Sequence, residues 1–204
     1  MTSGSRMAIK LIMSFLTALS LLFLNAQSMA AIAANDDNLN KLMASLAEKS
    51  MSKASFIERK SSSLLRQDLQ FEGELIYRRP DYMMKKTNVP RFELIEINEG
   101  KLLYKREGQP DRELALNNYP LLAAFVSAFT AVLSGDITKL QNYYKINFSE
   151  RDYGWRLSLS PLLKKMQETI ESIVIMGESD RIYNITITEA GGDKSMMTLR
   201  HKIQ

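Results

Sequence analysis

The sequence predicts an α+β protein in which helices cover one face of a curled antiparallel sheet of about eleven strands. Two observations lead to this prediction. From residue 51 onward, short runs that alternate apolar and polar side chains are separated by turn residues, as is typical of antiparallel strands. Midway along the chain, residues 114–135 contain no charged side chain and have helical spacing. A meander of that length curls or closes, and helices within it can cover the curled face.

The N-terminal segment is predicted to be a signal peptide that spans residues 1–30. Two basic residues precede the run LIMSFLTALSLLFL, whose fourteen residues carry no charge, and small residues follow it. Cleavage is expected after Ala30 or Ala33, which leaves residues 31–204 as one exported domain in the periplasm. The alternative is an uncleaved membrane anchor, although the run is shorter than the roughly 20 residues that a membrane-spanning helix needs.

The exported domain is expected to open with an amphipathic helix. Apolar residues in DDNLNKLMASLAEKS repeat at helical spacing, and Asp36 or Asp37 can cap the first turn. Strands follow, and the fourth and fifth are joined by a hairpin turn centred on Glu99 and Gly100. They are predicted at Lys53–Lys60, Leu69–Arg78, Tyr82–Thr87, Arg91–Asn98, Lys101–Arg106 and Arg112–Leu116.

A second helix is predicted within the uncharged segment. Its larger apolar side chains fall within one stripe of roughly 120°, and its opposite face carries small residues. Gly135 can end this helix, and Asp136 can cap a shorter one, ITKLQNYY. The long helix is either a movable cover over an apolar groove or a permanently buried core helix. Its stripe consists of Leu121, Leu122, Phe125, Phe129, Val132 and Leu133.

The last part of the chain returns to strands. PLLKKMQETI is predicted to be a further helix that begins at Pro161. In the strand before it, Trp155 and Leu157 share one face. The strands of this part are predicted at Tyr143–Ser149, Tyr153–Ser160, Glu171–Gly177, Arg181–Glu189 and Lys194–Ile203.

Residues 69–80, LQFEGELIYRRP, place a charge where none is expected. Because strand side chains alternate between faces, Arg78 falls with the polar residues and Arg79 falls with the apolar ones. An unpaired charge on an apolar face costs several kcal/mol. Arg79 is therefore expected either to turn toward water where Pro80 breaks the alternation, or to donate hydrogen bonds to carbonyls at a helix end or loop.

The composition excludes several classes of function. Removal of the predicted signal peptide takes away two of the 27 basic residues and none of the 23 acidic ones, so the net charge falls from +4 to +2. This charge is too small to indicate a nucleic-acid-binding protein. The chain has no cysteine and only one histidine, His201, so neither an ordinary catalytic triad nor a zinc cluster is expected. Eight of the 12 methionines follow the predicted signal peptide. They suit either a groove that adapts to different chains or ordinary core filling.

Three segments, ASFIERK, GELIYRRPDYMMKK and ELIEINEGKLLYKR, resemble the LolA lipoprotein-carrier family, and the match covers nearly the whole exported domain. The resemblance implies an unclosed antiparallel half β-barrel with an apolar concave face and helices as a lid. It also implies that Arg79, followed by Pro80, contacts the lid and helps to hold it closed. The Phe-x-Phe…Pro-x-Gly tail of the type members, which bears on delivery and acceptor choice, does not follow the last strand here, so the resemblance implies carriage and leaves the cargo open.

The resemblance therefore predicts a monomeric, chaperone-like periplasmic carrier in outer-membrane biogenesis, neither an enzyme nor dependent on a cofactor. Its partners would be an acylated lipoprotein or lipid cargo, an inner-membrane exporter and an outer-membrane acceptor. The alternatives are a lipoprotein-sensing regulatory module of the same fold, or a carrier of another acyl conjugate. Arg79 is the expected lid latch. The residues expected to bind ligand are Phe56, Phe71, Leu75, Tyr77, Met83, Leu121, Leu122, Phe125, Phe129, Val132, Trp155 and Leu157.

Overall fold

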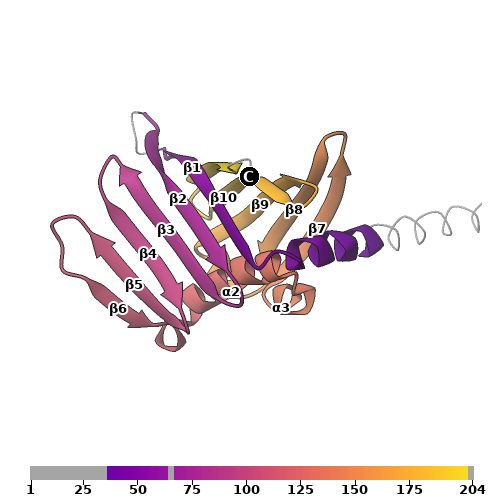
Figure 1. The fold of residues 1–204 in the computed structure, drawn as a ribbon, viewed down its shortest axis with the longest axis horizontal. Coiled ribbons are helices and arrows are strands. Elements are labelled where there is room, and N and C mark those ends of the chain that lie inside the picture. Colours follow the sequence, from indigo (N-terminus) through magenta and orange to yellow (C-terminus); the bar gives the residue numbers. More distant parts are fainter. Residues whose placement is uncertain (1–35, 64–66, 202–204) are drawn as a thin grey trace, which may run out of the picture. The chain divides into compact units, whose positions relative to one another are not determined.

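The computed structural model describes residues 36–63 and 67–201, and it confirms the predicted fold class. Eleven strands in this part of the chain form one antiparallel sheet, and helices accompany it (Figure 1). The sheet lies within a unit that runs from Asn40 to Gln204. The predicted signal peptide lies outside the described residues.

The strands closely follow the alternating runs of the sequence. The hairpin turn between β4 and β5 lies where it was predicted, because Glu99 and Gly100 both have positive φ and Asn98 pairs with Lys101. The strands are β1 (Met51–Ser61), β2 (Leu69–Arg78), β3 (Tyr82–Val89), β4 (Glu93–Asn98), β5 (Lys101–Arg106), β6 (Arg112–Ala115), β7 (Tyr144–Arg151), β8 (Gly154–Pro161), β9 (Ile170–Glu178), β10 (Arg181–Glu189) and β11 (Lys194–His201).

The strand order is β6-β5-β4-β3-β2-β1-β11-β10-β9-β8-β7. Two meanders, β1–β6 and β7–β11, are therefore joined where the first strand pairs with the last. We call them the first arm and the second arm. β6 and β7 end the sheet without pairing to one another, so in the described residues the sheet is open. Figure 1 shows the two arms facing each other across the concave side of the sheet.

One helix precedes the sheet and the others fall between strands, and the two helices predicted as ITKLQNYY and PLLKKMQETI are both shorter than expected. Residues 36–47 form the N-terminal helix. Between β6 and β7 come the short helix η1 (Leu116–Asn118), α2 (Pro120–Ser134) and α3 (Ile137–Gln141). α4 (Lys164–Gln167) is a single turn, so the prediction of a helix beginning at Pro161 is wrong. β8 continues to Pro161, which pairs with Tyr144, and this pairing delays the start of the helix.

α2 has the start and end that the sequence predicts. Pro120 occupies the first turn, where its missing N–H costs nothing. Gly135 has φ 71° and ends the helix, and the Asp136 N–H returns to the Ala131 carbonyl at 2.8 Å. Asp136 also accepts a hydrogen bond from the Lys139 N–H at 2.9 Å and so caps α3. A Cβ on Gly135 would lie 2.2 Å from the Met43 carbonyl oxygen, so glycine also allows the N-terminal helix to approach closely.

Gly73 has a packing role in β2, where the register with β3 shifts. A Cβ at this residue would lie 1.9 Å from the Lys86 carbonyl oxygen and 2.9 Å from the Phe56 ring. The backbone of β3 and the aromatic ring from β1 thus occupy the space that a side chain at Gly73 would need. This close approach brings the first three strands together beneath the concave face.

We predict that Gly73→Ala lowers the free energy of unfolding by about 1–3 kcal/mol, because the methyl group overpacks a site that is already filled. Urea denaturation of the purified protein measures the change. Gly191→Ala is the matched control, since a Cβ there has no neighbour within 4 Å. Equal stabilities of the two variants would contradict this account of β2.

Candidate ligand-binding groove

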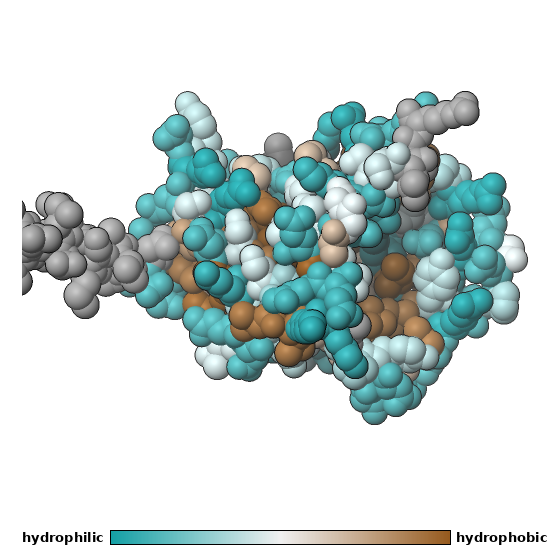
Figure 2. Space-filling model, turned by 180° about the vertical axis from the view of Figure 1, so that it is seen from behind, coloured by the Kyte–Doolittle hydropathy of each residue, from teal (hydrophilic) through white to brown (hydrophobic). Residues whose placement is uncertain are grey.

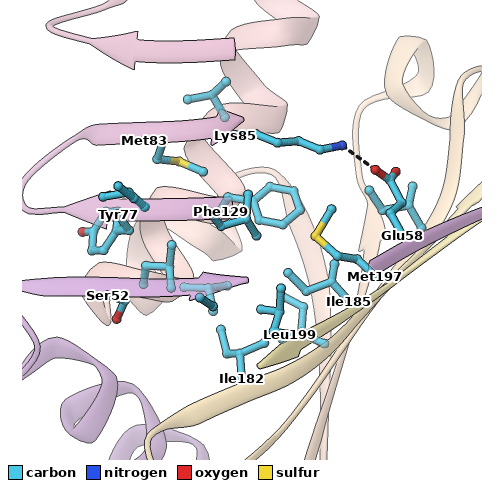
Figure 3. Close-up of a pocket in the computed structure, with 18 of the residues that line it drawn as sticks. Ser52, Glu58, Tyr77, Met83, Lys85, Phe129, Ile182, Ile185, Met197 and Leu199 are labelled. Carbon is cyan, nitrogen blue, oxygen red and sulfur yellow. Dashed lines mark hydrogen bonds and ion pairs between the residues drawn. The ribbon is translucent and has the colours of Figure 1, made fainter. Parts of the chain in front are cut away.

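The two arms enclose an apolar groove of about 510 Å³ on the concave side of the sheet (Figure 3). Its volume is within the roughly 300–1,000 Å³ of small-molecule sites in proteins. Strand alternation and antiparallel register bring side chains from many strands to this one face. The first arm contributes Ala54, Leu75, Tyr77, Met83, Ile95 and Ile97. The second arm contributes Ile175, Ile182, Ile185, Ile187, Met197 and Leu199.

α2 supplies the aromatic part of the groove lining. Phe125 and Phe129 are one turn apart, with ring centroids 5.0 Å apart and planes inclined at 56°. Both rings line the groove and are half-buried. The small residues of α2 are buried too, since Ala128 is 1 % exposed and Ala131 is fully buried. α2 is thus covered on more than its aromatic side, as the buried core-helix interpretation expects.

A buried carboxylate interrupts the apolar lining at one end of the groove. Glu58 of β1 is 3 % exposed. Its Oε2 lies 2.5 Å from the Lys85 Nζ on β3, and its Oε1 accepts a hydrogen bond from the Ser195 hydroxyl on β11 at 2.6 Å. The Lys60 Nζ lies 3.6 Å from Oε1. We call these four residues the Glu58 cluster.

The electrostatics of the Glu58 cluster keep the carboxylate charged. Burial by itself raises the pKa of the Glu58 carboxyl. The charge of Lys85 and the hydrogen bonds from Lys85 and Ser195 outweigh burial, so the pKa lies below its ordinary value of 4.5. Glu58 is therefore ionised at neutral pH, and the groove contains a true ion pair.

The Lys85 side chain reaches Glu58 by crossing the whole width of β2. Its ammonium lies 5.2 Å from the centroid of the Phe56 ring. Phe56 is paired across strands with Gly73, which has no side chain to stand in the way. The glycine, the aromatic ring and the long lysine stem together form the path across β2.

A second polar group lies elsewhere along the groove lining. The Lys49 Nζ lies 2.8 Å from Asp180 Oδ2 and donates a hydrogen bond to the Asp180 carbonyl at 2.9 Å. The hydrogen bond from Lys49 lowers the pKa of the Asp180 carboxyl. The Tyr77 hydroxyl donates to the Pro80 carbonyl at 3.3 Å, and a ring nitrogen of His201 lies 2.7 Å from the Ile182 carbonyl oxygen. Lys49 and Asp180 are each about one-third exposed, which makes this pair weaker than the Glu58 cluster.

The structure distributes the predicted ligand-binding residues over several environments. Six of them line the groove: Leu75, Tyr77, Met83, Phe125, Phe129 and Val132. Phe56 is buried beneath Lys85, and the ring of Phe71 lies 5.3 Å from the Lys60 ammonium. Leu122 does not line the groove but packs against a buried cluster that contains Leu102 and the groove residue Ile97. The side chain of Leu121 lies outside the described part.

Trp155 and Leu157 of β8 are buried in the second arm, away from the groove lining. The Trp155 ring occupies the space above Gly177, where a Cβ would lie 2.2 Å from the ring. Its indole N–H donates to the Ser179 carbonyl at 2.8 Å. These contacts place Trp155 in the packing of β8 against β9.

Arg79 lies just past the end of β2, which stops at Arg78. The strand alternation therefore does not carry Arg79 onto the apolar face. Its guanidinium instead donates to the carbonyl of Ala47, the last residue of the N-terminal helix, as the helix-end interpretation expects. This bond goes to a different helix from α2, for which the sequence allowed either a movable cover or a buried core helix. Arg78 is exposed and lies over the ring of Tyr82, 4.5 Å from its centroid.

The Glu58 cluster and the isoleucine-rich lining that the second arm contributes were not predicted from the sequence. Glu58 falls in step with Ala54 and Phe56, and Lys85 falls in step with Met83, so both charges were visible on apolar faces. The same reasoning was applied only to Arg79. On β10, a register shift between Ile182 and Asn184 allows Ile182 and Ile185 both to line the groove, which regular alternation does not predict.

These features define a class of protein: an open antiparallel half-barrel with an apolar groove on its concave face. Residues 29–200 match the family described as outer membrane lipoprotein carrier protein LolA-like, and the chain belongs to this family. No curated protein shows significant sequence similarity to the chain. Among the described residues, no helix is long and apolar enough to cross a membrane.

The solved structures to which the chain is similar are distant from it in sequence. The LolA superfamily protein NE2245 of Nitrosomonas europaea is 12% identical, with a TM-score of 0.45 over 83% of this chain and 93% of that chain. The Pseudomonas aeruginosa MucA/MucB complex contains a chain that is 11% identical, with a TM-score of 0.45 over 81% of this chain and 55% of that chain. LprF of Mycobacterium bovis is 9% identical, with a TM-score of 0.35 over 80% of this chain and 92% of that chain.

We predict that Glu58 makes stability depend on acid pH. A carboxylate whose pKa is lowered by folding stabilises the protein above its unfolded pKa, and this contribution is lost as pH falls through the lower folded value. At neutral pH, Glu58→Gln should lower the free energy of unfolding by about 1–3 kcal/mol, the range for hydrogen bonds to charged groups. Below the ordinary carboxyl pKa of 4.5, the difference between the two proteins should shrink.

Urea denaturation at a series of pH values measures this difference. Glu74→Gln is the control, because Glu74 pairs with Lys53 at 3.3 Å and the side chains of Lys53 and Glu74 are 46 % and 37 % exposed, compared with 4 % for Glu58. Exposed pairs contribute little, so this control should follow the wild-type curve closely. If Glu58→Gln and wild type show the same pH dependence, the ion pair does not stabilise the fold.

Proposed function

We propose that the protein is a periplasmic carrier that binds the acyl chains of lipoproteins, or of related lipids, in the groove and moves them from the inner to the outer membrane. One observation chiefly supports this proposal: a groove of about 510 Å³, lined by aliphatic, aromatic and methionine side chains, in a chain of the LolA-like family. The cargo would bind without a covalent bond, and the protein would act as a binding protein and not as an enzyme. The predicted signal peptide, residues 1–30, would direct it to the periplasm.

The energetics of an acyl chain explain why such a groove is needed. Burial is worth roughly 0.8 kcal/mol per CH₂, so a ~16-carbon chain bare in water costs about 12 kcal/mol. A carrier offsets this cost by replacing water with apolar walls. Met83 and Met197 lie on opposite arms of the groove, and unbranched thioethers conform to chains of different shape. Figure 2 shows apolar side chains gathered on one face of the molecule among hydrophilic ones.

Phe125 and Phe129 would respond to cargo in one of two ways. As a lid, α2 would lift and exchange the burial of its rings for burial of the acyl chain. As a core helix, α2 would stay in place and its rings would form one side of the occupied groove. The buried small residues of α2 favour the second behaviour, with side-chain movement in place of helix movement.

We predict that a photocrosslinking amino acid at Phe125 or Met83 captures acylated cargo in the periplasm, because both residues line the groove. Native mass spectrometry of the isolated protein, followed by analysis of extracted ligands, identifies what is bound. Met196 is the control, since it is 51 % exposed and is not among the groove-lining residues. Absence of lipid and acylated protein at both groove positions would refute carriage.

The same experiment can be extended to separate a carrier from a lipoprotein-sensing regulatory module. A carrier that has been loaded with labelled cargo should transfer it to outer-membrane vesicles. A sensor should retain the cargo in the presence of those vesicles. Retention together with normal loading would favour the regulatory alternative.

We further predict that Arg79→Leu alters the kinetics of cargo transfer, because it removes the hydrogen bond to the end of the N-terminal helix. That helix contributes Leu46 to the groove, so its position bears on access. A change of a few-fold in the transfer rate is expected for loss of one charge-assisted hydrogen bond. Arg78→Leu is the matched control, one residue away and exposed. Identical kinetics of all three proteins would show that Arg79 is no latch.

A further inference from the structure

Within the Glu58 cluster, the lysine side chains are more exposed than the carboxylate. The Glu58 side chain is 4 % exposed, whereas those of Lys85 and Lys60 are 23 % and 49 % exposed. The carboxylate oxygens already accept from Lys85 and Ser195. The groups that remain accessible to a ligand are therefore the ammonium groups and not the carboxylate.

Each ammonium group has three N–H donors, more than its contact with Glu58 requires. Lys85 directs one donor at Oε2, and its charge also lies over the Phe56 ring. Lys60 lies 3.6 Å from Oε1, outside hydrogen-bond distance, and 5.3 Å from the Phe71 centroid. Both lysines can therefore donate to an acceptor in the groove without first breaking the bonds of Glu58.

The apolar wall begins directly beside this cluster. Met197 is paired with Glu58 across β1 and β11, and Ile185 is paired with Met197 across β11 and β10. Figure 3 shows the ion pair at one end and Phe129, Met197, Ile185 and Leu199 beyond it. A polar end with spare cationic donors, continuous with an apolar wall, matches the two parts of an amphiphile.

We infer that the Glu58 cluster is a head-group site for an amphiphile whose acidic head, a carboxylate or a phosphate, binds the ammonium groups of Lys85 and Lys60 while its acyl chain lies in the groove. This inference rests on the proposed function, since it needs acyl-chain binding, and it narrows the ligand class. The acidic head would share the two lysines with Glu58. Charge complementarity supplies discrimination among ligands with the same tail.

Acidic side chains at this end of the groove would repel an acidic ligand. Glu189 also lines the groove, but it is exposed at the end of β10, where it pairs with Ile170. In solvent its charge is strongly screened. The carboxylate of Glu58 therefore repels an acidic ligand most directly. Removing its charge should raise the affinity for an acidic ligand, whereas a purely structural ion pair predicts no such increase.

The experiment measures the binding of dodecanoate, dodecyl phosphate and dodecanol to the purified protein by calorimetry, below the critical micelle concentration of the two acidic ligands and below the solubility limit of dodecanol. Wild type should bind the two acidic ligands about tenfold more tightly than dodecanol, as a charge-assisted hydrogen bond allows. Comparing dodecanoate with dodecyl phosphate shows which acidic head fits better. If no dodecyl ligand binds, the proposed function fails. If all three bind equally, acyl binding stands and the head-group site is refuted.

Three variants assign the effect to the cluster. Lys85→Met should reduce the preference for acidic heads to less than about threefold while dodecanol still binds, because one cationic donor is lost. Lys60→Met should have the same effect more weakly. Because the Lys60 side chain is half-exposed, this variant can be measured even if Lys85→Met does not fold. Lys86→Met is the matched control, since Lys86 neighbours Lys85 on β3 and does not line the groove.

Glu58→Gln is the decisive variant. It removes the competing charge and leaves both lysines, so the affinity for dodecanoate should rise by about threefold or more without a change for dodecanol. A purely structural ion pair predicts the opposite, because a disturbed groove would weaken all three ligands together. Unchanged or weaker binding of dodecanoate by a folded Glu58→Gln protein would overturn the inference.

Discussion

The groove depends on the pairing of β1 with β11, the first strand of the sheet with the last. The pairing aligns Phe56 with Leu199 and Lys60 with Ser195, and it joins the two arms into one curved surface. Each arm alone is a meander of five or six strands that carries only one side of the groove lining, so neither arm forms the groove by itself. Because these paired residues are more than 130 positions apart in sequence, the groove exists only when the whole chain has folded.

The same pairing creates the polar end of the groove. Glu58 lies on β1 between Lys85, contributed from β3, and Ser195, contributed from β11. A buried ion pair of this kind often contributes less to stability than apolar side chains of the same size, because both charges lose their water. Stability alone therefore does not explain why the Glu58–Lys85 ion pair lies on a face whose neighbouring residues are apolar. Ligand discrimination is one such reason, and accurate joining of three strands is another.

Local patterns predicted the fold more reliably than the site. Strand positions and the Glu99–Gly100 turn follow from period-two alternation and turn chemistry, which act over a few residues. The failures arose where a distant partner decides the outcome. β8 extends to Pro161 because Tyr144 pairs with it, and this pairing delays the start of the following helix. The Glu58 cluster joins three strands, so the sequence shows the anomalous charges but not that they meet.

An open sheet and a partly polar groove together suit a ligand that must be released. Apolar burial is non-directional and grows with chain length, so a fully closed apolar cavity would hold a long acyl chain too tightly to transfer it. The unpaired edges, β6 and β7, leave the concave side accessible, and β6 is only four residues long, which limits unwanted edge pairing. If an acidic head shares Lys85 with Glu58, its binding gains only a modest energy while distinguishing it from neutral heads, because Glu58 already neutralises much of the lysine charge. Affinity would then come from the tail and selectivity from the head.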